Sequence, residues 1–486
     1  MEGSKLSEIL SSIPQKEWRS LKEYVSSPFF NKNKHILELL EVIYKSLFYQ
    51  KKKYPTKDYL WKKLFPNKKY NEQRLFILMS KLDKLCTDYI TYQYIQANHT
   101  TNQVFALQAS VYRKIPKHFK RIFDTTKAKL EKQNLRSADY YYNDYLLRVE
   151  DDYHTHPNTQ KRNLVGLIQS LDSYYLATKL RYLCSYLNRR DLLQVKEQAE
   201  IQDFIQYLKK FDLSKLVVLN VYRLTLMTLV EPEKEKNYQE LKGLLNLHKK
   251  RIPKDETKDL YFYLQNYLVK KLNTGKSRYL RDLFSLYQDM LDNVLLKEGG
   301  GLNLHFKNIV TTALRLQEFE WAKDFIEENY QKLPEPDREN AYYYNVGNLA
   351  YYQQKFNEAM TNLVRVNSRN LSYNLGAKSI LLKSYYELDE EEALFSLTHS
   401  FATYIRRNKV MSDANKRNYL NMIKFLKRLS KLEKGDTKKA RKLLETLEET
   451  SNVLEKQWLI RKIKIKIPHH AILLAAVAFV PTARVT

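Results

Sequence analysis

The chain has 486 residues, of which 43% are hydrophobic, and it contains only 10 Gly and 12 Pro. So few helix-breaking residues, together with abundant Leu, Lys, Glu and Tyr, predict a mostly helical protein. The length predicts about three domains or one long solenoid. The formal net charge is +28, which favours acidic partners, although a composition rich in Lys, Asn and Tyr also fits A/T-rich codon usage.

The two cysteines, Cys86 and Cys184, are too few and too far apart for a disulfide framework or a metal site. This usage fits a reducing compartment. The first residues lack the basic and apolar segments of a secretory signal. The longest apolar run, 471–480, is much shorter than the roughly 20 residues that a spanning helix needs. We therefore expect a cytoplasmic protein and do not expect a membrane partner.

Residues 1–100 are predicted to form an N-terminal helical domain. Two amphipathic helices are expected, one around Trp18–Tyr24 and one over 35–49. Thr56 is then predicted to cap a short helix, and Asn71 a longer one. The longer helix has a single apolar face, formed by Leu75, Leu78, Met79, Leu82, Leu85, Cys86 and Tyr89.

The short helix, the turn and the longer helix have the outline of a helix-turn-helix. They resemble the winged-helix unit that precedes helical repeats in some bacterial transcriptional activators. This resemblance implies DNA binding. The longer helix carries Arg74, Lys81 and Lys84 as its basic residues, whereas that family has an Arg-rich recognition helix.

Positive charge concentrates in residues 51–136, which hold 20 Lys and Arg against 6 Asp and Glu. Aromatic residues interleave with these cations, a pattern that suits phosphate contact and base stacking. The same pattern also fits a solvated helical face over an apolar core. Within this region we interpret the polar segment 98–103 as a linker. The candidate nucleic-acid contacts are Lys68, Lys69, Arg74, Lys81, Lys114 and Lys117.

Residues 101–300 are predicted to form helical hairpins with degenerate repeats. Wide apolar stripes predict helices over 163–187, 194–210, 214–230, 236–249, 257–272 and 277–295. Turns are expected at 188–191 and at Asn273–Gly275. The glycines at 299–301 mark the sharpest break, so we place a domain boundary at 300.

Residues 301–460 show the clearest repeat. Small residues recur in successive second helices, at Ala322, Ala359, Ala393 and Ala440. Ala359 follows Ala322 by 37 residues and precedes Ala393 by 34. Gly347 and Phe356 occupy the small and aromatic positions of the same unit. These features resemble the tetratricopeptide repeat. The resemblance implies an all-α solenoid of stacked helical hairpins, in which neighbouring pairs share a continuous core.

The resemblance also implies a concave surface lined by the first helix of each pair. Its candidate partner-binding residues are Lys307, Asn308, Tyr344, Asn345, Asn348, Tyr352, Lys383 and Tyr386. In the peptide-clamping subset of the family, Lys and Asn hold a C-terminal carboxylate. Lys307, Asn345 and Asn348 partly match that arrangement. An ordinary solvated groove is the alternative.

The sequence contains no catalytic constellation and no Gly-rich phosphate loop. Acidic and histidine residues cluster at 150–156, and the HTHP sequence at 154–157 is interpreted as a polar loop rather than a metal site. We therefore predict a non-enzymatic protein–protein interaction scaffold without a cofactor, a metal or a small-molecule substrate. Its expected partner is a protein or peptide of acidic character. The alternative is a nucleic-acid-binding transcriptional regulator that uses the basic region 51–136.

Residues 461–486 form a C-terminal tail of different character. Ile463, Ile465 and Ile467 alternate with Lys, as in a strand, and an apolar run follows at 471–480. Docking on the last repeat, disorder, contact with a membrane surface and an altered reading frame all fit this pattern.

Overall fold

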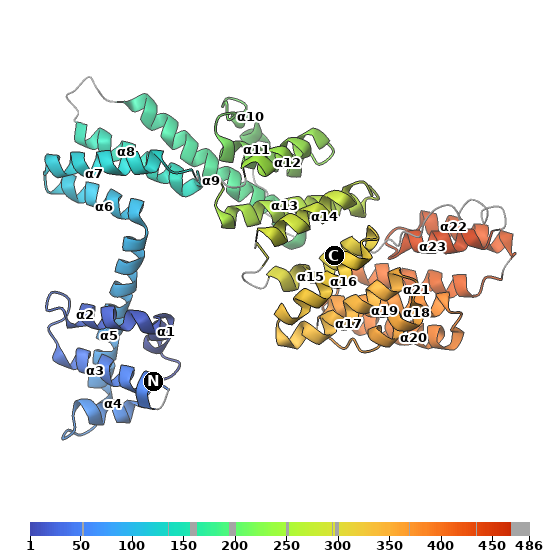
Figure 1. Cartoon of the computed structure of the whole chain (residues 1–486), viewed down its shortest axis with the longest axis horizontal. Helices are drawn as coiled ribbons and strands as arrows, with labels where there is room; N and C mark the ends of the chain where they lie inside the picture. The colour runs from blue at the N-terminus through green and yellow to red at the C-terminus, as the bar shows by residue number, and fades with distance from the viewer. Residues whose placement is uncertain are drawn as a thin grey trace. The chain divides into compact units, whose positions relative to one another are not determined.

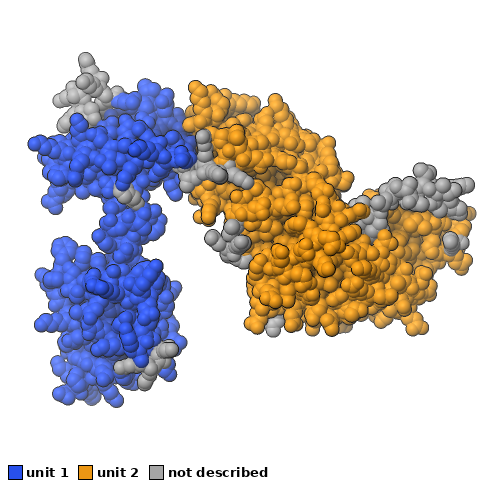
Figure 2. Space-filling view, in the orientation of Figure 1, with its two compact units in different colours: residues 1–176 blue, residues 177–486 orange. Residues whose placement is uncertain are grey.

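The computed structural model describes residues 1–50, 53–134, 136–155, 163–193, 201–248, 252–293, 295–296, 301–368, 370–433 and 435–467. Within these residues the protein is all-α, with 23 α-helices and no strand (Figure 1). The chain divides into two compact units, residues 1–176 and 177–486 (Figure 2). The all-α fold expected from the sequence is confirmed. The proposed boundaries at 100, 300 and 460 stay predictions.

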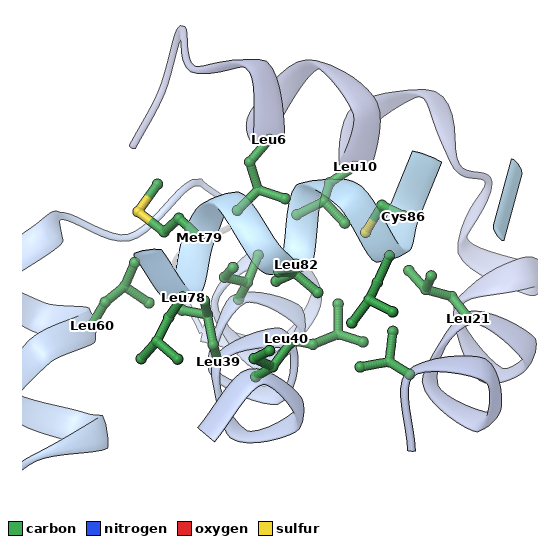
Figure 3. Close-up of a cluster of buried hydrophobic side chains, with 14 of the residues drawn as sticks. Leu6, Leu10, Leu21, Leu39, Leu40, Leu60, Leu78, Met79, Leu82 and Cys86 are labelled. Carbon is green, nitrogen blue, oxygen red and sulfur yellow. The ribbon is translucent and has the colours of Figure 1, made fainter. Parts of the chain in front are cut away.

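Unit 1 begins with five α-helices that share one core. They are α1 (Lys5–Ser12), α2 (Trp18–Ser26), α3 (Lys34–Lys45), α4 (Lys57–Leu64) and α5 (Glu72–Ala97). A 3₁₀ turn at Gln15–Glu17 precedes α2, and a π-helical turn at Ser46–Gln50 follows α3. Leucines of α1, α2, α3 and α4 surround α5 (Figure 3). The N-terminal helices therefore form a bundle around a central helix.

The sequence pattern of α4 and α5 is confirmed in detail. The buried face of α5 consists of the seven residues predicted from the helical period. Thr56 Oγ1 accepts a hydrogen bond from Tyr59 N at 3.3 Å, and Asn71 Oδ1 accepts one from Arg74 N at 2.8 Å. Each cap satisfies a backbone N–H that the first helical turn leaves without a partner.

The rest of unit 1 contains α6 (His99–Tyr112), α7 (Pro116–Glu131), α8 (Ala138–Thr155) and the beginning of α9 (Leu164–Leu193). The predicted linker at 98–103 is wrong, because α6 begins at His99 and only Asn98 interrupts the helix. Val104 and Leu107 of α6 are buried, so apolar burial holds this polar start in a helix. The predicted turn at 188–191 is also wrong, because α9 continues through it.

Unit 2 contains the end of α9 and fourteen further α-helices within the described residues. They are α10 (Ile201–Leu208), α11 (Val217–Val230), α12 (Glu235–His248), α13 (Lys254–Asn273), α14 (Tyr279–Asp292), α15 (Gly301–Arg315), α16 (Phe319–Asn329), α17 (Glu335–Tyr352), α18 (Phe356–Leu363), α19 (Leu371–Glu387), α20 (Glu391–Arg407), α21 (Asp413–Ser430), α22 (Thr437–Glu449) and α23 (Lys456–Ile465). A 3₁₀ turn, Tyr330–Lys332, follows α16. The range 194–200 and the expected break at 297–300 lie outside the described residues.

Helices of unit 2 pack in consecutive pairs, from α11 with α12 to α21 with α22. Among the first helices, α15 also packs on α17 and α17 packs on α19, which is the arrangement of a solenoid. Gly347 of α17 lies at a close helix crossing, as predicted. A Cβ atom on Gly347 would lie 2.7 Å from Leu363 Cγ and 3.2 Å from the Ala359 carbonyl oxygen.

The turns of the four pairs from α15 to α22 share one left-handed residue. A residue with positive φ precedes the second helix by two positions, at Gln317 (63°), Gln354 (60°), Asp389 (55°) and Gly435 (103°). In the second of these turns, Lys355 N donates to the Ala350 carbonyl at 2.9 Å. The same bond pattern recurs after Gln317 and Asp389. These three turns therefore end α15, α17 and α19 in the same way, whereas α21 ends at Ser430, five residues before Gly435.

When positions are counted from the start of each second helix, the predicted small position at Ala393 is off by one residue. Ala322, Ala359 and Ala440 are the fourth residues of their helices, and all three are buried. In α20 the fourth residue is Leu394, which is buried, whereas Ala393 is only partly buried. The structural step from Ala359 is therefore 35 residues rather than 34.

The described part of the C-terminal tail is helical, so the predicted strand pattern at 463–467 is wrong. In α23, Trp458, Leu459 and Ile463 are buried, which is the spacing of one helix face. The helix packs on α21 and α22. Residues 468–486, including His469, His470 and the apolar run, lie outside the described residues.

Candidate functional site

A cavity of about 560 Å³ lies in unit 2 beside the first helices α15, α17, α19 and α21. We call it the Lys307 cavity. Five of the eight predicted concave residues line it, and they come from three successive helix pairs: Lys307, Tyr344, Asn348, Tyr352 and Lys383. The structure therefore brings most of the predicted residues to one hollow.

Helical spacing explains why α17 supplies three of these side chains. Tyr344, Asn348 and Tyr352 are four residues apart, so they share one face of the helix. Gly376 of α19 provides the space for Tyr344, because a Cβ atom there would lie 2.8 Å from the Tyr344 hydroxyl oxygen. The hydroxyl of Tyr344 is deeply buried, and this burial raises its pKa well above the usual value. Tyr344 is thus a neutral wall of the cavity.

The ammonium group of Lys307 is shielded from water by the surrounding side chains. Its Nζ donates to the Ser372 carbonyl oxygen at 3.0 Å and to Ser372 Oγ at 2.7 Å. It also lies 5.1 Å from the centre of the Tyr344 ring. Burial lowers the pKa of Lys307 to about 8. In the described part of the chain no carboxylate forms an ion pair with it. Lys307 therefore carries a charge at neutral pH that an acidic ligand can pair.

Lys383, the second lysine of the cavity, is already paired. Its Nζ lies 3.2 Å from Oε2 of Glu455, and both side chains are almost fully buried. The ring of Tyr351 lies 4.6 Å from the same Nζ. Glu455 has a positive φ of 56° and immediately precedes α23. Lys383 therefore fixes the segment before α23 and is not available as an open cation.

The other three predicted concave residues do not line the cavity. Asn308 is buried in α15. Asn345 is fully buried, and its amide donates to the Ala341 carbonyl oxygen at 2.7 Å. Tyr386 packs edge-on against Trp458 of α23, with ring centres 5.5 Å apart. Their side chains belong to the helix packing around the cavity.

Several lining residues were not predicted. Ser372 comes from α19, and a further group comes from α21: Asn415, Asn418 and Tyr419. The α21 group could have been found, because polar and aromatic residues recur there at spacings of three and four. The concave face therefore extends to α21, the first helix of the fourth pair, beyond the three pairs that the sequence prediction covers.

The six predicted nucleic-acid contacts are all exposed in unit 1, but they form separate groups. Lys68, Lys69 and Arg74 lie at the start of α5, and Lys81 follows two turns later. Lys114 and Lys117 lie at the turn between α6 and α7. Helix α5 separates the first group from α6, and its 26 residues span about 39 Å. The basic region 51–136 is therefore not one cluster.

The predicted core cysteines are buried. Cys86 and Cys184 are both free thiols, and burial raises the pKa of Cys86 to about 12. In the acid–histidine segment, the ring of His154 stacks on Phe119 at 3.9 Å, and Glu150 accepts from Gln108 at 2.9 Å. The predicted polar loop is wrong for His154 and Thr155, which end α8, and its other two residues, 156 and 157, lie outside the described residues. Across the described ranges, no group of His, Cys, Asp and Glu is placed to hold a metal.

The fold and the cavity define an all-α protein whose second unit stacks helical pairs around a partly polar hollow. None of the known protein families, curated proteins and solved structures compared with the chain matches it. The tetratricopeptide resemblance therefore stays a prediction. None of the described helices is both long enough and apolar enough to cross a bilayer.

Proposed function

We propose that the protein is a non-enzymatic protein–protein interaction scaffold and that the Lys307 cavity binds an acidic segment of its partner. One observation carries this proposal: concave residues predicted on three successive helix pairs line a single cavity of about 560 Å³. This volume is typical of ligand pockets. A solenoid that presents such a hollow on its first helices suits the capture of a peptide.

The lining chemistry favours a carboxylate. Lys307 supplies a positive charge without an acidic partner among the described residues, and its environment strengthens a new charged hydrogen bond. The Asn348 amide can bond a peptide backbone, and Tyr352 provides a stiff contact surface. The net charge of +28 would attract acidic partners over longer distances. Free, buried cysteines accord with the cytoplasmic location that we infer.

The test is an affinity capture from cell extract with the full chain as bait. Lys307→Met and Asn348→Ala should each lose a partner that the natural sequence retains, because each removes a polar contact inside the cavity. Lys323→Met is the matched control, since Lys323 is exposed on the second helix α16. If every partner is recovered equally with all four proteins, the cavity is not the binding site. Circular dichroism checks that each variant is folded.

A further inference from the structure

We propose that the turn between α4 and α5 is a phosphate-binding site through which the protein binds duplex DNA. The Arg74 guanidinium lies 4.6 Å from the centre of the Phe65 ring. The Lys68 ammonium lies 5.7 Å from the same ring centre. A single aromatic ring thus holds two cations close together. This site is in unit 1 and is independent of the scaffold function proposed for the Lys307 cavity.

The platform under these cations is rigid. Phe65 is only 4% exposed and packs against Trp61 at 4.6 Å between ring centres. Trp61 Nε1 donates to the Lys68 carbonyl oxygen at 2.9 Å, which fixes the turn. The Asn71 cap bonds the backbone N–H of Arg74. Because the cations are already positioned, their side chains lose less conformational entropy when a ligand binds.

Two nearby carboxylates, those of Glu72 and Glu38, interact with residues other than these cations. Glu72 is paired with Lys57, at 2.7 Å between Oε1 and Nζ. Glu38 is hydrogen-bonded to His35 Nδ1 at 2.8 Å, and the His35 ring lies 4.7 Å from the Phe65 ring. In the described part of unit 1, Lys68, Lys69 and Arg74 form no ion pair with a carboxylate. Three exposed cations without acidic partners favour a polyanion.

The outer face of α5 makes duplex DNA the favoured polyanion. After Arg74, the exposed residues Ile77, Ser80 and Lys81 continue along this face. Arg and Lys side chains bond base edges, and an apolar side chain such as Ile77 suits the thymine methyl group. An α-helix of about 10–12 Å diameter fits a major groove about 12 Å wide. In this arrangement the turn contacts the phosphates while α5 enters the groove.

Fluorescence anisotropy of the full chain with a short labelled DNA duplex, measured over a salt series, tests the proposal. The triple variant Lys68→Ala, Lys69→Ala and Arg74→Ala should weaken binding by about tenfold or more, and should lower the slope of log K against log salt by about 2–3. The matched control removes two lysines and one arginine from the exposed face of α22: Lys438→Ala, Arg441→Ala and Lys442→Ala. This control should bind nearly as tightly as the natural sequence.

A second variant separates organised geometry from simple charge. Arg74→Lys keeps the charge but loses the planar group that stacks on Phe65, so it should weaken binding while leaving the salt slope unchanged. Three outcomes would overturn the proposal. The first is no binding of the duplex by the natural sequence. The second is an equal loss in the α22 control. The third is binding of phosphatidylserine vesicles in place of the duplex.

Discussion

Lys383 and Glu455 form an ion pair in the interior of unit 2, with Nζ of Lys383 3.2 Å from Oε2 of Glu455. A second ion pair joins the same two parts of the chain, since Lys462 Nζ lies 2.5 Å from Oε2 of Glu387. Trp458 Nε1 donates to the other oxygen of Glu387 at 3.3 Å. The segment at the start of α23 is therefore fixed to α19, one wall of the Lys307 cavity.

Breaking the buried pair should be costly. Lys383→Met leaves Glu455 desolvated without its cation, so we expect the free energy of unfolding to fall by about 3–5 kcal/mol. The double variant Lys383→Met, Glu455→Leu removes both charges and should recover most of this loss. Urea denaturation of four proteins measures the difference: the natural sequence, Lys383→Met, Glu455→Leu and the double variant. If the losses of the two single variants simply add in the double variant, the pair is not coupled.

A methyl group at Gly347 should destabilise unit 2. It would press against Leu363 and the Ala359 carbonyl, and this overpacking outweighs the gain in helix propensity. We expect Gly347→Ala to lower stability by roughly 1–2 kcal/mol. Gly243→Ala is the control, because a Cβ atom there meets nothing within 4 Å in the middle of α12. Gly243→Ala should raise the free energy of unfolding by up to about 1 kcal/mol. If Gly347→Ala also raised it, the close crossing at Gly347 would be contradicted.

The left-handed turn at Gln354 predicts a stabilising change. A side chain at a φ of 60° is strained, so Gln354→Gly should raise the free energy of unfolding by roughly 0.5–1 kcal/mol. Gln353→Gly, one residue earlier at a φ of −78°, should instead lower it, since glycine there only adds freedom to the unfolded chain. Thermal melting of the two variants shows whether their effects have opposite signs.

The depressed pKa of Lys307 predicts a dependence on pH. The folded state loses this proton near pH 8, whereas the unfolded chain keeps it to about pH 10.5. The unfolded state therefore binds more protons in that interval, and the contribution of Lys307 to stability rises with pH across it. Lys307→Met should lack this contribution, so the difference in unfolding free energy between the two proteins should change from pH 7 to 10.

The same titration should act on ligand binding in the opposite direction. As pH rises through 8, Lys307 loses its positive charge, so its attraction for a carboxylate declines. Binding of a captured acidic partner should weaken over this range with the natural sequence and should change less with Lys307→Met. An affinity that is flat with pH in both proteins would show that Lys307 does not contact the acidic group.

The sequence alone determined the features that depend on local periodicity and capping. The apolar face of α5 could be predicted residue by residue, because a period of 3.6 places those positions on one side of any helix. Thr56 and Asn71 could be assigned as caps, because their short side chains reach the free N–H groups of the next turn. Gly347 and Ala359 could be assigned to a close helix crossing, because only small side chains let two helix backbones approach each other.

Only the tertiary structure decided the features that depend on contacts between distant segments. The turns at Gln317, Gln354 and Asp389 contain no glycine, so their left-handed geometry follows from the helix pairs that they join. The described tail is a helix rather than a strand because α21 and α22 bury its apolar face. The Lys307 cavity has the same origin. Its walls meet because successive helix pairs cannot bury their apolar faces alone and must stack.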